Sequence, residues 1–112
     1  MLTMEHILRR AYPVLPVLVI DDVERAVGLA QALHDGGLNV IEVTLRTPQA
    51  LEAIQVIRQE VPDLIVGVGT VIRAEQFAQA IDAGAQFAVS PGFTERLTQA
   101  AQETELPYLP AV

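Results

Sequence analysis

Short apolar runs recur along the sequence at nearly even intervals, and this spacing restricts the possible folds more than any other feature. The runs are centred near residues 17, 42, 67, 88 and 109, so neighbouring runs are about 21 to 25 residues apart. Between the runs, apolar residues recur every three or four positions, as they do along one face of an amphipathic helix. Strands that alternate with helices form parallel sheets with right-handed crossovers. The sequence therefore predicts an α/β fold.

Capping and terminating residues delimit the predicted helices. Thr47 can cap a helix whose first residue is Pro48, and Gly36–Gly37 ends the helix before it. The predicted helices run from Thr3 to about Ala11, from Asp21–Asp22 to Gly36–Gly37, from Thr47 to Pro62, from Arg73 to Asp82, and from Thr94 onward. The residues predicted to face the sheet are Val23, Ala26, Val27, Ala30 and Leu33, then Leu51, Ile54, Ile57 and Val61, then Phe77, Ala80 and Ile81, and finally Leu97, Ala100 and Ala101.

A leading helix followed by (βα)4β units fits two architectures. One is an open, doubly wound sheet of flavodoxin type, and the other is just over half of a (β/α)8 TIM barrel, whose usual length is about 250 residues. The strand over residues 39–45 favours the barrel, because one of its faces carries Glu42, Thr44 and Arg46. A central strand of an open sheet is covered on both faces and is apolar on both. We expect residues 1–112 to form a single domain.

The segment Asn39–Thr47 carries the first candidate functional residues. Side chains alternate along a strand, which places Ile41, Val43 and Leu45 on one face and Val40, Glu42, Thr44 and Arg46 on the other. Burying an unpaired carboxylate is costly, and functional sites of parallel α/β folds lie at the carboxyl ends of strands. Glu42 and Arg46 are therefore candidate site residues. A purely structural ion pair between them is the alternative.

Composition narrows the partners and the chemistry. The net charge is −7, with 14 acidic residues, which argues against a nucleic-acid surface. No apolar run approaches the roughly 20 residues of a membrane span. The absence of cysteine excludes thiolate chemistry and fits a cytoplasmic location. His6 and His34 lie on different predicted helices, so we expect no metal site, and no other cofactor is expected.

Lysine is absent from the sequence. All seven basic residues are arginines. An amine nucleophile for Schiff-base chemistry therefore cannot come from any side chain of these 112 residues.

Three motifs, in order and at consistent spacing, resemble the 2-keto-3-deoxy-6-phosphogluconate / 4-hydroxy-2-oxoglutarate aldolase family. The resemblance spans about residues 6–110. The motifs are Ile41–Thr47 (IEVTLRT), Val66–Val71 (VGVGTV) and Ala83–Gly92 (AGAQFAVSPG), supported by Pro13–Val17 and Leu106–Pro110.

The resemblance implies a fold, a reaction and a set of site residues. Members of this family are (β/α)8 barrels, usually trimers, that cleave the 2-keto acid to pyruvate and an aldehyde through a Schiff base. By resemblance, Glu42 is the general acid/base, Arg46 and Thr70 hold the pyruvate carboxylate, and Pro91 lines the pocket. The implied partner is a small 2-keto acid, with neither nucleic acid nor membrane involved.

The resemblance also implies what these residues lack. In the family, the Schiff-base lysine lies on the strand after the one predicted near residue 109, and the phosphate-binding loops come later still. The family usually has Pro-Gly where this sequence has Pro110–Ala111. We therefore expect an N-terminal portion of the barrel, whether as a natural truncation, an engineered half-barrel or one piece of a split enzyme.

Two other functions compete with an aldolase. A non-catalytic half-barrel would leave two strand edges unpaired and expose lumen-facing Val40, Val66 and Val68, so we expect self-association or pairing with a complementary C-terminal half. The run Val17–Asp22 resembles the acidic first strand of a phosphoacceptor receiver domain. That function requires an acceptor aspartate where Gly67–Thr70 stands, and a lysine.

Overall fold

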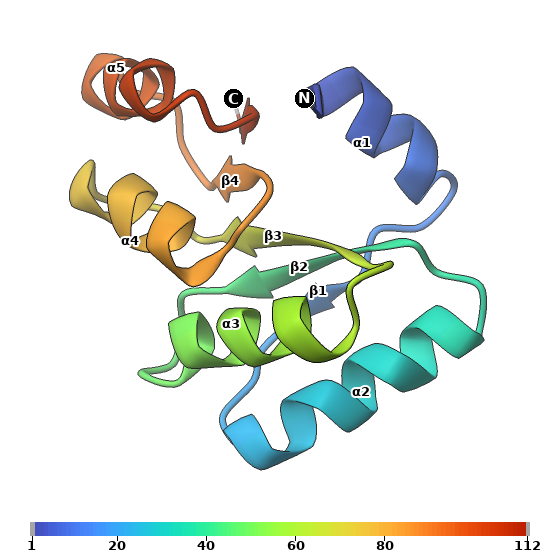
Figure 1. Ribbon diagram of the computed structural model, residues 1–112. Helices are drawn as coiled ribbons and strands as arrows, with labels where there is room; N and C mark the ends of the chain where they lie inside the picture. The colour runs from blue at the N-terminus through green and yellow to red at the C-terminus, as the bar shows by residue number, and fades with distance from the viewer. Residues whose placement is uncertain (1, 112) are drawn as a thin grey trace.

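In the computed structural model, which describes residues 2–111, five strands pair in parallel in the order in which they occur along the chain (Figure 1). The elements are α1 (Met4–Ala11), β1 (Val17–Leu18), α2 (Val23–Asp35), β2 (Val40–Thr44), α3 (Ala50–Glu60), β3 (Ile65–Gly69), α4 (Glu75–Ala83), β4 (Ala88–Ser90), α5 (Glu95–Thr104) and β5 (Tyr108–Pro110). The predicted leading helix and (βα)4β order are confirmed.

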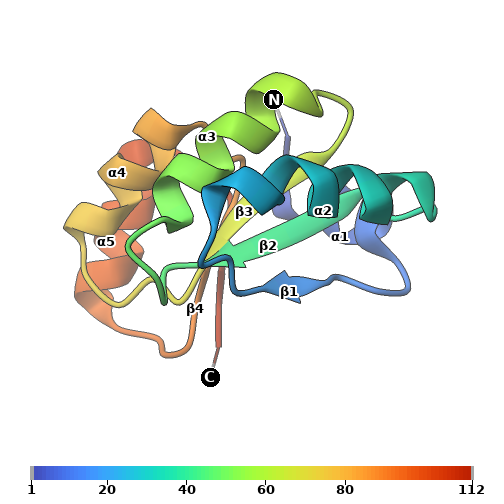
Figure 2. The ribbon, with the colours of Figure 1, turned by 90° about the horizontal axis from the view of Figure 1, so that it is seen from below.

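The layers of the fold distinguish the two architectures. Figure 2 shows α2, α3, α4 and α5 following one another around one side of the sheet, and each packs against the next. The strand order β1-β2-β3-β4-β5 runs without reversal. A doubly wound sheet would reverse its strand order and carry helices on both faces. The fold is therefore the first part of a TIM-barrel type of winding, as the polar face of β2 predicts.

Two apolar clusters cover opposite faces of the sheet. The larger cluster lies under helices α2 to α5 and includes Ile41 and Val43 of β2. The smaller lies on the opposite face, called the inner face below, and joins Ile7 and Ala11 of α1 to side chains of the sheet. Its other members are Val40 of β2, Ile65 of β3 and Phe87, which directly precedes β4. Helix α1 therefore covers the inner face at the amino-terminal ends of the strands.

The prediction for Val66 and Val68 was wrong. Both valines lie in the cluster under the helices, because they pair in register with Ile41 and Val43 of β2. Val40 does lie on the inner face, but α1 buries it completely. The apolar inner-face side chains at this end are thus covered within the chain itself.

The first strand is shorter and more exposed than its sequence suggests. The run over residues 14–20 forms only the two-residue strand β1, at one edge of the sheet. Val17 lies opposite Glu42 and is 56% exposed, and Val19, on the same face, is 54% exposed. Burial on both faces was therefore a wrong prediction: Leu18 and Ile20 pack in the cluster under the helices, whereas Val17 and Val19 on the inner face stay exposed.

The helices keep most of their predicted buried residues. Ala26, Ala30, Ile54, Ile57, Val61, Phe77, Ala80, Leu97 and Ala101 are buried, and Val23, Val27, Leu33, Leu51 and Ala100 are partly buried. Ile81 is the exception, at 40% exposed, because the buried stripe of α4 is Gln76, Phe77 and Ala80. Helix α4 also begins at Glu75 rather than at Arg73, since Gln76 Oε1 accepts the backbone N–H groups of Ile72 and Arg73.

Candidate functional site

Glu42 lies in the middle of β2 with its side chain on the inner face. It is opposite Val17 of β1 and Gly67 of β3, and only 7% of it is exposed. Its carboxyl group reaches toward the next glycine of β3, because a Cβ at Gly69 would lie 2.6 Å from Cδ and 2.9 Å from Cγ of Glu42. The alternation predicted for β2 thus places the carboxylate where a barrel has its interior.

Burial and one nearby charge act on this carboxyl group in opposite directions. Desolvation raises the pKa of Glu42 above its ordinary value of 4.5, while the guanidinium of Arg46 lowers it by a smaller amount. Within residues 2–111, no ion pair of 4.0 Å or less joins Glu42 to Arg46. The purely structural ion pair considered from the sequence is therefore not formed. Glu42 is instead a buried acid that holds its proton more tightly than an exposed one.

The other three candidates lie just beyond the carboxyl ends of adjacent strands. Arg46 follows β2, Thr70 follows β3 directly, and Pro91 follows β4 directly. Because these strands are parallel and pair in sequence, the three residues share one edge of the sheet. Arg46 and Pro91 are exposed, and Thr70 is half-buried. The structure thus puts all three at the edge toward which the carboxyl group of Glu42 reaches, since that group lies against Gly69, the last residue of β3.

Thr70 has an unusual backbone conformation. Its φ is 60°, in the left-handed region. A β-branched residue with positive φ is a genuine outlier, and such strain costs about 1 to 3 kcal/mol. Strained residues of this kind cluster at functional sites. The conformation distinguishes Thr70 from the regular residues of β3 before it, and no sequence pattern predicts it.

Threonine hydroxyls hold the end of β2 in place. Thr44 Oγ1 donates to the carbonyl oxygen of Leu18 at 3.1 Å, and Thr47 Oγ1 donates to that of Ile20 at 2.5 Å. The two bonds tie the segment on either side of Arg46 to the last residue of β1 and to the chain just after it. Thr47 therefore does not cap α3 as predicted; the residue before α3 is Gln49, which makes no side-chain capping bond.

Two further hydrogen bonds, at the end of β4, were not predicted from the sequence. Buried Ser90 donates from Oγ to the carbonyl oxygen of Gly92 at 2.6 Å, and Ser90 Oγ lies 2.6 Å from Tyr108 Oη. Since the single hydroxyl proton of Ser90 goes to Gly92, Tyr108 donates to Ser90. These bonds fix the turn that carries Pro91. Ser90 and Tyr108 meet only through the pairing of β4 with β5, so no local sequence signal connects them.

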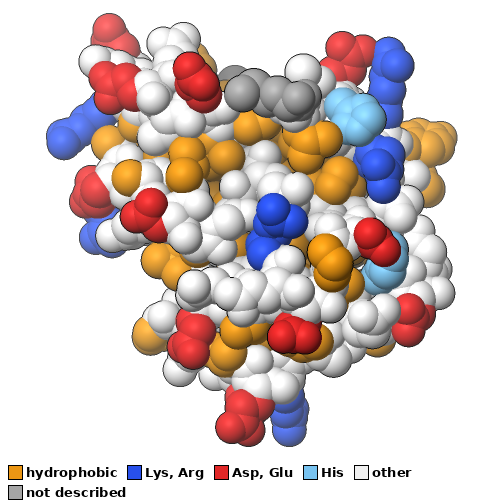
Figure 3. All heavy atoms as spheres, viewed as in Figure 1, with side chains coloured by type: hydrophobic (Ala, Val, Ile, Leu, Met, Phe, Trp, Pro, Cys, Tyr) orange, Lys and Arg blue, Asp and Glu red, His pale blue; other side chains and the backbone are white. Residues whose placement is uncertain are grey.

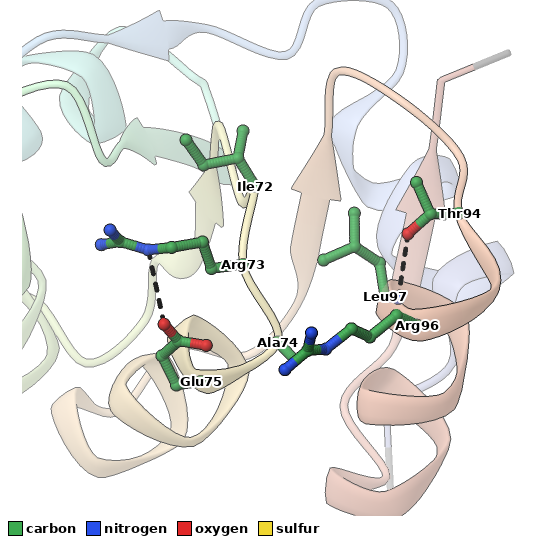
Figure 4. Close-up of a pocket in the computed structure, with 7 residues that line it drawn as sticks. All are labelled: Ile72, Arg73, Ala74, Glu75, Thr94, Arg96 and Leu97. Atoms are coloured by element: carbon green, nitrogen blue, oxygen red, sulfur yellow. Dashed lines mark hydrogen bonds and ion pairs between the residues drawn. The ribbon is translucent and has the colours of Figure 1, made fainter.

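A hollow of about 230 Å³ lies beside this edge (Figure 4). It is formed by the start of α4 and the start of α5, and its lining includes Arg73, Glu75, Thr94 and Arg96. Figure 4 shows Arg73 paired with Glu75, whose atoms are 3.6 Å apart, and Thr94 accepting from the backbone of Leu97. None of the four candidate residues lines the hollow. It is a neighbouring feature, distinct from the inner-face position of Glu42.

Within residues 2–111, no group of three or more His, Asp or Glu side chains is arranged to hold a metal ion. In the same range, no helix combines the length and the apolar character needed to cross a bilayer.

Figure 3 shows hydrophobic side chains gathered over the upper half of the face seen in Figure 1, with acidic side chains mainly around its outline.

The in-order parallel sheet and its interior carboxyl group define a TIM-barrel-type α/β protein with a candidate acid/base on the inner face of its sheet. The model of the KDPG and KHG aldolase family matches residues 4–112. The chain therefore belongs to the KDPG/KHG aldolase family, and the resemblance seen in the three sequence motifs is confirmed.

Individual relatives support this membership. The chain is 55% identical over 102 residues to the 2-dehydro-3-deoxy-phosphogluconate aldolase of Dickeya dadantii, covering 91% of this chain and 48% of that protein. It matches the crystal structure of 2-keto-3-deoxy-6-phospho-gluconate aldolase from Zymomonas mobilis with a TM-score of 0.93 and 50% identity, covering 99% of this chain and 53% of the other.

A third relative carries a ligand. The KDPG aldolase of Legionella pneumophila, with pyruvate captured at low pH as a covalent carbinolamine intermediate, matches with a TM-score of 0.87 and 48% identity. The match covers 92% of this chain and 50% of that one. The chain spans about half the length of the curated relatives it matches.

Proposed function

We propose that this chain carries the acid/base and carboxylate-binding groups of a class I aldolase, a lyase that acts through a Schiff base. The reaction is cleavage of 2-keto-3-deoxy-6-phosphogluconate to pyruvate and glyceraldehyde 3-phosphate, of 4-hydroxy-2-oxoglutarate to pyruvate and glyoxylate, or of both. Family membership supports the proposal, as does the carbinolamine formed by pyruvate in the Legionella pneumophila relative. We also propose a cytoplasmic location.

The buried carboxyl group of Glu42 is the observation that carries the proposal. Carbinolamine formation, its dehydration and carbon–carbon cleavage each require a proton to move. One group can serve all three steps if its pKa lies nearer neutrality than that of an exposed carboxylate. Burial shifts the pKa of Glu42 in this direction. Its position on the inner face directs it toward the edge where the other candidates lie.

Arg46, Thr70 and Pro91 have the complementary role of holding the substrate. A planar guanidinium binds a carboxylate through two parallel hydrogen bonds. Arg46 is exposed and makes no ion pair within the described chain, so its donors are free for a 2-keto acid. The hydroxyl of Thr70 supplies a further donor beside it, and Pro91 forms an apolar wall of the pocket.

The amine for the Schiff base must come from outside these side chains, because the sequence contains no lysine. By resemblance, the amine belongs to a lysine on a later strand of the family's barrel. The functional partner is then a lysine-bearing C-terminal half, and the assembled enzyme forms a homo-oligomer, a trimer in the family.

Mixing the chain with the lysine-bearing C-terminal half of the Escherichia coli KHG/KDPG aldolase tests this function. Pyruvate release, measured by coupled oxidation of NADH, should arise only in the mixture. Substituting Glu42→Gln should abolish it, because the amide cannot exchange the proton. The matched variant Glu52→Gln, at an exposed position of helix α3, should leave the rate unchanged. A mixture that works equally well with Glu42→Gln would contradict the assignment.

A non-catalytic half-barrel that self-associates is the alternative function. The exposed apolar side chains of Val17 and Val19 favour it, because edge strands with such side chains pair with other chains. This alternative predicts that the mixture releases no pyruvate although the chain associates with itself.

A further inference from the structure

Two glycines of β3 leave spaces on the inner face that other side chains fill. A Cβ at Gly69 would collide with Oε2, Cδ and Cγ of Glu42. A Cβ at Gly67 would collide with Cζ, Cε1 and Cε2 of the Phe87 ring. Glu42 comes from β2 on one side of β3, and Phe87 comes from the segment before β4 on the other. Strand β3 therefore supports a carboxyl group and an aromatic ring that it does not itself supply.

The ring and the carboxyl group occupy successive levels of the inner face. Alternate residues of a strand are about 7 Å apart, so the space at Gly67 lies one level closer to α1 than the space at Gly69. Phe87 is fully buried at the lower level and packs with Val40, Ile65 and Ile7 of α1. The Phe87 ring thus lies one level below the Glu42 carboxyl group, on the side toward α1.

We propose that Gly69 and Phe87 are positioning residues for Glu42: Gly69 leaves the space that the carboxyl group occupies, and Phe87 closes that space from below. The inference rests on the proposed function, in which Glu42 is the acid/base. It adds that Phe87 excludes water from the side of the Glu42 carboxyl group that faces α1. Neither Gly69 nor Phe87 touches the reacting atoms, so their effects act through Glu42.

The charged surroundings of Glu42 are simple enough for this effect to be measured. Arg46, at the end of the same strand, supplies the opposing electrostatic effect on the pKa. The residues opposite Glu42 on its two neighbouring strands are Val17 and Gly67, which do not titrate. A change in the pKa of Glu42 after substitution at Phe87 therefore reports a change in burial.

A double-mutant cycle tests the role of Gly69. Gly69→Ala should lower the urea denaturation midpoint strongly in the parent chain, because the new methyl group occupies the place of the carboxyl group. In a Glu42→Ala background most of that loss should disappear, since Cγ, Cδ and Oε2 are gone. Val66→Ala, on the same strand but the opposite face, should cost the same in both backgrounds. An equal loss from Gly69→Ala in both backgrounds would overturn the assignment.

A titration tests the role of Phe87 and does not require the Gly69 variant to fold. The pKa of Glu42, followed through its ¹³C carboxyl resonance, should fall toward 4.5 in Phe87→Leu, because a smaller side chain admits water beneath the carboxyl group. Val66→Ala should leave the pKa at its parent value. An unchanged pKa of Glu42 in Phe87→Leu would refute the proposal that Phe87 shields the carboxyl group from water.

Neither readout requires catalysis, so the two proposals fail separately. Pyruvate release that is indifferent to Glu42→Gln would refute the proposed function and leave the positioning inference standing. Absence of coupling between Gly69 and Glu42 would refute the inference and leave the aldolase proposal standing.

Discussion

Glu42 is a buried acid that has no close ionic partner among residues 2–111, and its protonation should therefore be visible in the stability of the chain. Because its pKa is raised, the folded chain binds the proton more tightly than the unfolded chain does. The contribution of protonated Glu42 is fully present below about pH 4.5 and is lost as the pH rises through the raised pKa.

Glu42→Gln removes this pH dependence. Relative to the parent, the variant should gain stability as the pH rises above about 4.5, by about 1.4 kcal/mol for each unit by which the pKa is raised. Urea denaturation between about pH 3.5 and pH 8 measures the difference. A difference that stays constant over this range would mean that the carboxyl group titrates normally.

Thr70 is expected to lower the stability of the chain through its backbone strain and to contribute to substrate binding through its hydroxyl group. Thr70→Gly relieves the strain at a φ of 60°, and after the entropy of the more flexible unfolded chain we expect a net gain of about 1 kcal/mol in the free energy of unfolding. Pyruvate release in the two-part mixture should fall, because the hydroxyl is lost. Thr70→Ala is the matched control, since it loses the hydroxyl but keeps the strained Cβ. A stability gain from alanine as well would remove backbone strain as the cause.

Among the elements, α1 has a role beyond its eight residues. It closes the inner face below Glu42 through Ile7, which is completely buried. Ile7→Ala should lower the free energy of unfolding by about 2 to 5 kcal/mol, because it leaves a cavity in that cluster. Leu8→Ala, on the exposed side of the same helix, should change it by less than about 0.5 kcal/mol. Urea denaturation of both variants checks the contrast, and equal losses would show that α1 does not seal this face through Ile7.

The elements also show which parts of the fold and of the candidate site can be predicted from the sequence. Ile41, Glu42 and Val43 were assigned to the correct faces, because alternation within one strand is a local property. Val66 and Val68 were assigned to the wrong face, since the inward face of β3 depends on its register with β2. The glycines that follow each of them, Gly67 and Gly69, could have indicated the answer: a strand that alternates valine with glycine has one bare face, and side chains from neighbouring strands must fill the space there.

Contacts between residues that are far apart in the sequence could not be predicted, for a similar reason. The bond between Ser90 and Tyr108 depends on the pairing of β4 with β5, and the strain at Thr70 depends on how the chain leaves β3. The exposure of β1 likewise depends on what lies beyond the edge of the sheet. Strand alternation and the family resemblance named the candidate residues, whereas the contacts that hold them in place come from strand pairing.

At the scale of the whole molecule, the exposed edge at β1 predicts association. The parent chain should sediment above its monomer mass of 12.1 kDa at low micromolar concentration, because Val17 and Val19 leave an apolar edge uncovered. The double substitution Val17→Lys and Val19→Lys should yield a monomer. Ile81→Lys, an exposed apolar position on α4, is the control and should not change the mass. A cooperative, monomeric parent chain would contradict this expectation.

The composition of the whole chain predicts its behaviour toward pyruvate alone. Borohydride added to the isolated chain with pyruvate should give no covalent adduct on an internal residue, because the sequence has no lysine. Mass spectrometry of proteolytic peptides makes the measurement. An internal adduct would show that another group acts as the nucleophile.

The alternation of Gly67 and Gly69 also bears on transplanting this chemistry. Strand β2 supplies Glu42, but the space that its carboxyl group occupies is left by Gly69 of β3. A designer who grafts a glutamate into another parallel barrel must therefore move a bare position on the adjoining strand along with it. Without that glycine, the graft would contain the glutamate but would lack the space that its carboxyl group occupies.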